Sequence, residues 1–197
     1  MGRQLIAITG GIGAGKSVVS RILRQMGYPV YDSDSQAKKL MDADCEIKRR
    51  LAAEISAAVV CEGEIQRAVL AEMVFNDSAK LAILNDIVHT SVKADIQEYF
   101  KIQESKIVFV ETAILYQSGL NREVDAEWRV TAPLETRIER VELRNGLSRK
   151  QVCERIASQE NHIVEDEIKP PVSMIENDGL QALVPQINKL LAEALAR

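Results

Sequence analysis

The stretch from Gly10 to Ser17 constrains the fold of this chain more than any other. Its sequence, Gly-Gly-Ile-Gly-Ala-Gly-Lys-Ser, matches the phosphate-binding P-loop pattern G-x-x-x-x-G-K-S. The residues before it, Leu5 to Thr9, form the apolar run of a strand that is buried on both faces. The residues after it, 18–26, place their apolar side chains on one face of a helix. A loop between a strand and a helix is the context that this motif requires, which a chance glycine-rich turn would lack.

The residue types of this loop match the chemistry of a nucleoside triphosphate. Glycines let the backbone curl so that successive N–H groups face phosphate oxygens, and the following helix adds its positive dipole end. Lys16 brings a positive charge to the outer phosphates, and the hydroxyl of Ser17 is an oxygen ligand for Mg²⁺. The candidate nucleotide-binding residues of the loop are Gly11, Ile12, Gly13, Ala14, Gly15, Lys16, Ser17 and Val18.

Composition narrows the class of protein. The 197 residues are 46% hydrophobic and 27% charged, which suits one substantial α/β domain. A net charge of −4 gives no support for nucleic-acid binding, and no apolar run is long enough to cross a membrane. The three cysteines, Cys45, Cys61 and Cys153, fit neither a zinc site nor a disulfide framework. The first strand starts too early for a signal peptide, so we expect a cytoplasmic protein.

A short second strand, Val30 and Tyr31, leads into Asp32-Ser33-Asp34. Ligands of doubly wound sheets bind outside the carboxyl ends of the strands, so a carboxylate here is placed to meet the nucleotide. Asp32 or Ser33 can instead cap the helix that follows. We predict that one of these residues caps the helix and that Asp34 takes part in the chemistry.

The next seventy residues, about 35–105, contain helical patterns and no clear strand. Ser78 is the expected cap of a helix that His89 interrupts and that resumes at Val92. We predict a helical insertion between two strands of the sheet. Taken alone, His89 is more typical of a structural residue than of a catalyst, and Arg67 of a surface charge.

Three further strands complete the expected sheet: 107–110, 128–131 and 172–175. Glu111, at the end of the first of these, either orders water around Mg²⁺ or caps a helix. Asn177-Asp178-Gly179 forms a turn, and an amphipathic helix over 183–195 ends the chain.

Arg137, Arg140 and Arg144 share one face of a helix after Pro133, because they are spaced by three and four residues. This face is either a solvated basic surface or part of a lid that closes arginines over the triphosphate. Ser148 and Gln151 form the capping-box pattern of the next helix, which runs to Gln159.

In its ordered set of motifs, the chain resembles the dephospho-coenzyme A kinases over nearly its whole length. The matching segments are Thr9 to Ser17, Asp32-Ser33-Asp34, Leu84 to His89, Glu111 to Gly119, Arg137 to Arg144 with Arg155 and Gln159, and Asn177-Asp178-Gly179. The chain departs from the family pattern at Gln66, Thr90, Ala113, Gln117, Pro171 and Val172, several of them near the expected acceptor site. None of these departures touches the P-loop or Asp34.

The resemblance implies an α/β P-loop kinase fold of three layers. Its parallel sheet of five strands has the order 2-3-1-4-5, with a helical coenzyme A-binding region at about 35–105 and a helical lid at about 137–165, all within a single domain, 1–197. It also implies transfer of the γ-phosphoryl group of ATP, with Mg²⁺, to the ribose 3′-hydroxyl of dephospho-CoA, by a monomer or weak homo-oligomer.

The resemblance further assigns roles to individual residues. Asp34 becomes the base and a substrate-binding residue, Arg140 or Arg144 an ATP ligand, and Arg67 and His89 acceptor-side residues. It places Lys16, Asp34 and Arg140 in the catalytic set, Ser17 on the metal, and Asn177 with the nucleotide.

Two other functions fit part of the sequence. Another small-molecule kinase would share all of these features except the acceptor pocket. A GTPase would need the motif Asn-Lys-x-Asp, whereas Asn188-Lys189 is followed by two leucines within a predicted helix.

Overall fold

The computed structural model describes residues 2–160 and 169–196 of the chain. The described residues divide into two compact units, one formed by those within the ranges 1–31 and 102–197 and the other by Asp32–Lys101. Each unit has its own hydrophobic cluster and is described by itself. Among the described residues, no helix combines the length and the apolar character that crossing a membrane needs.

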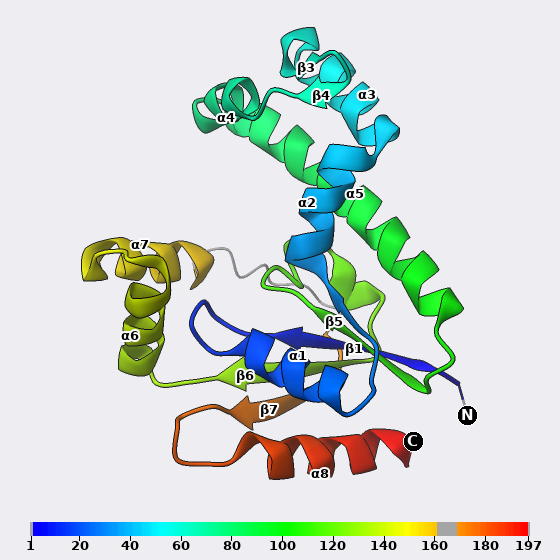
Figure 1. Cartoon of the computed structure of the whole chain (residues 1–197), viewed down its shortest axis with the longest axis vertical. Helices are drawn as coiled ribbons and strands as arrows, with labels where there is room; N and C mark the ends of the chain where they lie inside the picture. The colour runs from blue at the N-terminus through cyan, green and yellow to red at the C-terminus, as the bar shows by residue number, and fades with distance from the viewer. Residues whose placement is uncertain (1, 161–168, 197) are drawn as a thin grey trace. The chain divides into compact units, whose positions relative to one another are not determined.

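The first unit is built on a parallel sheet of five strands (Figure 1). The strands are β1 (Gln4–Thr9), β2 (Val30–Asp32), β5 (Ile107–Glu111), β6 (Ala126–Thr131) and β7 (Val172–Glu176). They lie in the order β2-β5-β1-β6-β7. Counted among these five strands alone, this is 2-3-1-4-5, so the expected α/β fold and strand order are confirmed.

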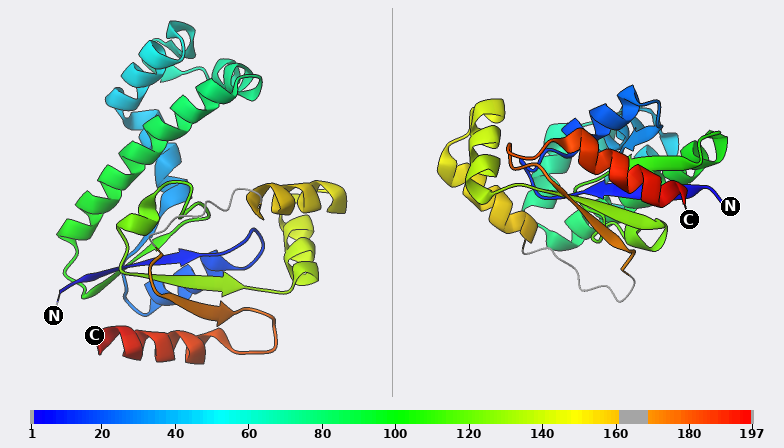
Figure 2. Two further views of the ribbon diagram at one scale, coloured as in Figure 1. Left: turned by 180° about the vertical axis from the view of Figure 1, so that it is seen from behind. Right: turned by 90° about the horizontal axis from the view of Figure 1, so that it is seen from below.

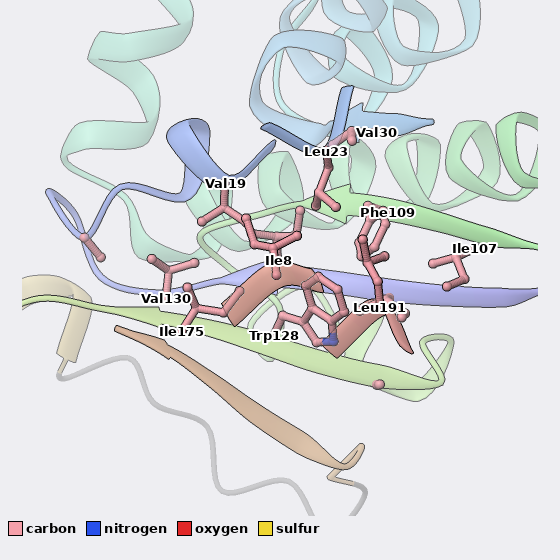
Figure 3. Packing of buried hydrophobic residues seen from close by; sticks show 14 residues of the cluster. Ile8, Val19, Leu23, Val30, Ile107, Phe109, Trp128, Val130, Ile175 and Leu191 are labelled. Atoms are coloured by element: carbon pink, nitrogen blue, oxygen red, sulfur yellow. The ribbon is translucent and has the colours of Figure 1, made fainter. Parts of the chain in front are cut away.

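The helices of this unit are α1 (Lys16–Gln25), α6 (Leu134–Asn145), α7 (Arg149–Glu160) and α8 (Leu183–Leu195), with a 3₁₀ turn at Leu120–Arg122. Helices α1 and α8 cover the same face of the sheet (Figure 2). In Figure 3 their side chains, Val19, Leu23 and Leu191 among them, pack against alternate residues of the strands. Phe109 and Trp128 meet at the centre with ring centroids 4.9 Å apart.

Both faces of the two central strands are buried, because Leu5 to Ile8 and Ile107 to Val110 are all at most 3% exposed. This is the physical reason why these strands read as unbroken apolar runs in the sequence. Parallel pairing sets Ile8 opposite both Glu111 and Trp128. The carboxyl ends of β1, β5 and β6 therefore share one edge of the sheet, from which the P-loop leaves.

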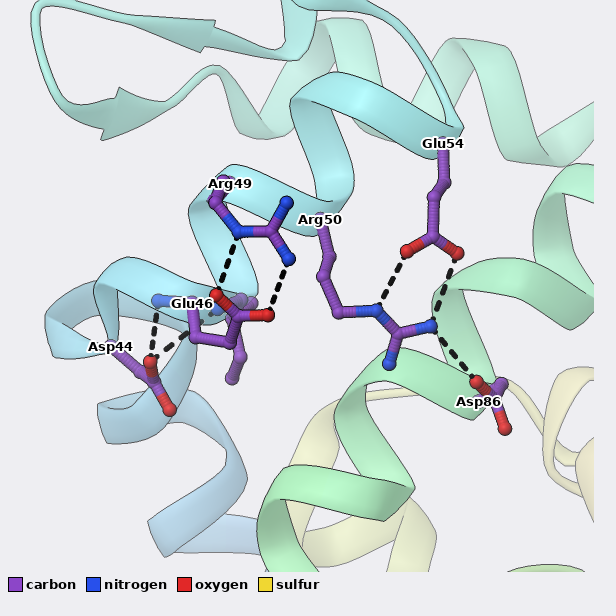
Figure 4. A network of polar contacts seen from close by, with 7 residues as sticks. Asp44, Glu46, Arg49, Arg50, Glu54 and Asp86 are labelled. Atoms are coloured by element: carbon purple, nitrogen blue, oxygen red, sulfur yellow. Dashed lines mark hydrogen bonds and ion pairs between the residues drawn. The ribbon is translucent and has the colours of Figure 1, made fainter.

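The second unit is mostly helical. It contains α2 (Ser33–Ala43), α3 (Cys45–Glu54), a 3₁₀ turn at Ala57–Val59, α4 (Arg67–Phe75) and α5 (Ser78–Ile102). Its core joins Ile47, Leu51, Val59, Leu70 and Ile87 from these elements. Arg50 links α3 to α5, since it binds Glu54 at 2.7 Å and Asp86 at 3.1 Å (Figure 4).

Three local expectations for this unit are wrong. His89 does not interrupt a helix, because α5 runs unbroken through it; histidine is an ordinary residue inside helices. Asp77, not Ser78, caps α5, since its carboxylate accepts from the backbone N–H groups of Ala79 and Lys80.

The third difference is a small hairpin that sequence patterns did not indicate. It pairs β3 (Val60–Cys61) with β4 (Glu64–Ile65). Its two turn residues, Glu62 and Gly63, both have positive φ, as a tight hairpin turn requires. Strands of two residues are too short to show a period, and glutamate is not a usual residue at the first turn position.

Candidate functional site

The P-loop follows β1 directly and leads into α1 through Gly15, the N-cap residue of that helix, which has φ of 100°. Packing as well as backbone geometry requires glycine here, because a Cβ at Gly15 would lie 2.1 Å from the side-chain nitrogen of Asn177. At Gly13, with φ of 80°, a Cβ would lie 2.5 Å from the carbonyl oxygen of Arg137. The loop is thus closely enclosed by α6 and by the turn after β7.

Five carbonyl oxygens of the loop accept hydrogen bonds, two from donors within the loop and three from side chains outside it. The planar peptide unit fixes the direction of each N–H against its neighbouring C=O, so these bonds set the orientation of the loop's peptide planes. The donors are Lys16 Nζ to Gly10 (2.9 Å), Ala14 N to Gly11 (3.1 Å), Arg137 Nε to Ile12 (3.0 Å), Arg140 Nη1 to Gly13 (3.5 Å) and Asn177 Nδ2 to Ala14 (2.8 Å).

Arg140 and Asn177, predicted nucleotide-binding residues, therefore lie at the P-loop. The guanidinium of Arg140 also donates to the backbone oxygen of Asn177, at 3.1 Å. Arg144, one turn further along α6, is exposed and donates to the side chain of Asn145, at 2.9 Å. The structure thus brings the first arginine to the loop and leaves the second at the surface of its helix.

Lys16 and Ser17 form the first turn of α1, with Lys16 half-buried and Ser17 exposed. Within the described part of the chain, no group of three or more acidic, histidine or cysteine side chains is arranged to hold a metal ion. A cation bound by the Ser17 hydroxyl would complete its coordination with oxygen atoms of a ligand and of water. This is the arrangement that Mg²⁺ commonly adopts with nucleotides.

Glu111 ends β5 opposite Ile8 of β1. Residues 112–119 form turns, and Thr112, not Glu111, accepts from the N–H of Ile114, at 3.2 Å. In this described segment there is no helix for Glu111 to cap. Its other expected role, ordering water around Mg²⁺, stays a prediction.

In the second unit, Asp32 is the cap of α2. Its carboxylate accepts from the N–H of Ser35 at 3.1 Å and from the Ser35 hydroxyl at 2.8 Å. Asp34 lies in the first turn of the same helix and is exposed. Capping and an available carboxylate are therefore divided between the two aspartates as predicted, while the chemical role of Asp34 stays a prediction.

The other expected acceptor-side residues, Arg67 and His89, also belong to the second unit. Arg67 forms an exposed ion pair with Asp42 at 2.5 Å. His89 is half-buried on α5, and burial lowers its pKa, as does the charge of Lys93, while Asp86 opposes this change. A neutral imidazole is thereby favoured at this position.

Two features of the first unit were missed or underestimated at the level of sequence. Gln159, noted only as part of a family pattern, accepts from the N–H of Ile12 at 2.7 Å. Glu127 is fully buried, where it accepts from the Tyr116 hydroxyl and from Arg129, both at 2.6 Å. Neither residue belongs to a recognisable local motif, and the partners Ile12 of Gln159 and Tyr116 of Glu127 lie outside the element that carries each residue.

The parallel sheet, its strand order and the P-loop define the class of the protein, a P-loop kinase. Comparison with known proteins supports this. The model of the family described as dephospho-CoA kinase matches residues 4–182. The chain belongs to the dephospho-CoA kinase family.

Individual relatives extend over nearly the whole chain. A dephospho-CoA kinase of Bacteroides fragilis is 39% identical over 188 residues, covering 95% of this chain and 91% of its own. One from Thermus thermophilus is 36% identical over 190 residues, covering 96% and 91%.

Solved structures agree. A crystal structure of a Thermus thermophilus protein superposes with a TM-score of 0.75 at 32% identity, covering 100% of this chain and 98% of that one. A dephospho-CoA kinase from Campylobacter jejuni gives 0.66 at 23% identity, covering 96% of both chains, which supports the fold.

Proposed function

We propose that this protein is a dephospho-CoA kinase, which transfers the γ-phosphoryl group of ATP to the ribose 3′-hydroxyl of dephospho-CoA, the last step of coenzyme A synthesis. The observation that carries the proposal is a P-loop whose conformation is fixed by hydrogen bonds, in a chain that belongs to the dephospho-CoA kinase family. Five of its carbonyl oxygens accept hydrogen bonds, three of them from the side chains of Arg137, Arg140 and Asn177 outside the loop. A loop whose peptide planes are oriented in advance binds phosphate with a smaller loss of conformational entropy.

Lys16 and Ser17 act on the phosphates in this proposal. The Lys16 ammonium neutralises charge on the outer phosphates, where charge builds up during transfer. The hydroxyl of Ser17 would hold Mg²⁺, which would supply positive charge to neutralise the phosphates. Its exposed hydroxyl at the start of α1 fits this role.

Asp34 is the proposed base. A ribose hydroxyl is a weak nucleophile, and a carboxylate that accepts its proton assists attack on the γ-phosphorus. Because Asp32 already caps α2, the Asp34 carboxylate is not required for that purpose. Arg67 and His89 are proposed to contact the acceptor, within a coenzyme A-binding region at about 35–105.

Arg140 and Arg144 are the proposed arginines of the nucleotide site, and Asn177 supports the loop beside them. The lid is proposed to span about 137–165, of which residues 161–165 lie outside the described part of the chain. We also propose that the enzyme works in the cytoplasm, as a monomer or weak homo-oligomer.

A turnover assay tests this function directly. The purified protein is mixed with Mg²⁺ and either ATP or GTP, with and without dephospho-CoA, and the coenzyme A formed is measured by mass spectrometry. We expect coenzyme A with ATP, little product with GTP, and slow nucleotide hydrolysis without acceptor. Equal or faster phosphorylation of another acceptor in a panel of nucleosides and small alcohols would favour a different kinase. GTP hydrolysis without any acceptor would favour a GTPase that acts as a molecular switch.

A further inference from the structure

The P-loop residue Ile12 is held on three sides by the pair of helices α6 and α7. Its side chain packs against their apolar cluster, Ile138, Val141, Val152 and Ile156. Its backbone oxygen accepts from Arg137 of α6, and its backbone N–H donates to Gln159 of α7. The middle of the loop is therefore anchored by a part of the chain more than a hundred residues away.

Gln159 does more than accept one bond. Its amide nitrogen donates to the backbone oxygen of Ala113 at 3.3 Å, while its oxygen is 2.7 Å from the Ile12 nitrogen. One half-buried side chain thus joins the P-loop to the segment that follows β5. A side-chain amide can donate and accept in this way without carrying a charge, whereas a carboxylate only accepts and an ammonium only donates. A carboxylate at this place would bring negative charge to a loop that is built for phosphate.

We propose that Gln159 is a positioning residue for nucleotide binding. Together with Arg137, it fixes both backbone groups of Ile12 and so sets the orientation of the peptide planes at the middle of the loop. Gln159 itself is not required to touch the nucleotide. This inference rests on the proposed function only in taking ATP as the ligand of the P-loop.

Gln159→Met tests the proposal, because methionine keeps the length of the side chain and removes both hydrogen bonds. The matched control is Glu154→Gln, at an exposed position of the same helix. Calorimetry measures the dissociation constant for ATP, and nuclear magnetic resonance measures hydrogen exchange at the Ile12 amide without ligand. We expect the dissociation constant to rise on the order of tenfold, since an amide loses its partner in a loop that must stay ordered. Exchange at Ile12 becomes faster, and the control matches the wild type.

A double variant with Arg137→Met separates positioning from general stability. Because both side chains act on Ile12, their effects on ATP affinity are expected to be non-additive. Unchanged ATP affinity in Gln159→Met would overturn the proposal. So would a loss of affinity that only follows a loss of folded protein, as judged from the thermal midpoint.

Should Gln159→Met not fold, Gln159→Asn replaces it, as its shorter side chain cannot span from Ile12 to Ala113. Intermediate ATP affinity then supports the proposal, and wild-type affinity contradicts it. The readout is ATP binding rather than turnover. A protein that bound ATP but did not phosphorylate dephospho-CoA would therefore disprove the proposed function and still test this inference.

Discussion

At the scale of single residues, Lys16 gives the most direct prediction. Its ammonium lies 2.9 Å from the Gly10 oxygen, within the loop where phosphates are expected to bind. Lys16→Met should abolish phosphoryl transfer and leave the fold intact, because the substitution removes charge rather than core packing. Turnover and circular dichroism check the two parts. Lys189→Met, an exposed lysine of α8, is the matched control. Wild-type turnover in Lys16→Met would disprove the P-loop assignment.

Asp34 and Asp32 provide a second comparison, two residues apart on the chain. Asp34→Asn keeps the shape of the side chain and removes its charge, so we expect near-complete loss of turnover with nucleotide binding retained. Asp32→Asn keeps an oxygen that can accept from Ser35, so we expect only a modest loss. Normal turnover in Asp34→Asn would contradict any role of Asp34 in the chemistry.

The response to magnesium separates two ways in which Asp34 could act. If it holds the metal, directly or through water, raising the Mg²⁺ concentration should restore much of the activity of Asp34→Asn. If it is the base, added Mg²⁺ should have little effect, since no metal replaces a proton acceptor.

Tyr116 and the buried Glu127 give a prediction about stability. The pKa of Tyr116 is raised to about 12 by burial and by its hydrogen bond to Glu127. Tyr116→Phe should destabilise the protein by about 1–3 kcal/mol, because it removes a hydrogen bond to a buried charged group. Denaturant unfolding near neutral pH measures this difference. Lys106→Gln, at an exposed position outside the Tyr116–Glu127 pair, is the control and should change little.

The same hydrogen bond predicts a pH dependence. The phenol ionises at a higher pH in the folded protein than its ordinary value of 10.0, so the folded state holds the proton more tightly. The stabilisation is complete below pH 10 and is lost as the pH rises toward 12. Tyr116→Phe should lack this contribution, and an identical alkaline profile in both proteins would contradict it.

Whether a side-chain contact can be predicted from the sequence depends on how close in sequence the two residues lie. The capping pair Ser148 and Gln151 was predictable from a spacing of three, and it forms as expected. Glu127 was not predictable, because a glutamate within an apolar strand has no local signal for a tyrosine eleven residues before it.

At the scale of elements, helix α6 carries the arginines for which the sequence allows two roles, a solvated basic face or part of a lid over the nucleotide. Arg140→Ala and Arg144→Ala should lower turnover, and at least one of them by a factor on the order of 10², as for arginines that stabilise charge in phosphoryl transfer. Since Arg140 also donates to Gly13, its loss should in addition raise the KM for ATP. Lys150→Ala, an exposed cation of α7, is the control. Full activity in both arginine variants would show that these arginines form only a solvated basic face.

Elements with a strong period were predicted well, and those decided by tertiary contacts were not. The central strands and α8 follow directly from apolar runs and from helical spacing. By contrast, α5 continues through His89 because residues of the helix on both sides of it, such as Ile87 and Ile96, are buried. Such packing overrides a weak local preference.

At the scale of the whole molecule, the strand order came from the resemblance and not from any local pattern. Hydrophobic periodicity identifies strands but does not order them. The parallel direction of the strands follows from the helical segments that connect them. The position of Gln159 and Arg137 on Ile12 is a consequence of this topology, because α6 and α7 follow the strand next to β1.

The division into two units predicts how each substrate protects the chain from hydrogen exchange. A non-hydrolysable ATP analogue with Mg²⁺ should slow exchange in the first unit, around residues 10–18 and 137–146, because ligand binding opposes local opening. Dephospho-CoA should slow exchange within Asp32–Lys101, the unit that holds Arg67 and His89. Mass spectrometry of peptic peptides measures both effects.

Lys16→Met is the control for the nucleotide, and it should lose the first effect while keeping the second. Protection by dephospho-CoA confined to the first unit would contradict an acceptor role for the helical unit. Because exchange reports binding and not turnover, this outcome would be visible even in variants that are inactive.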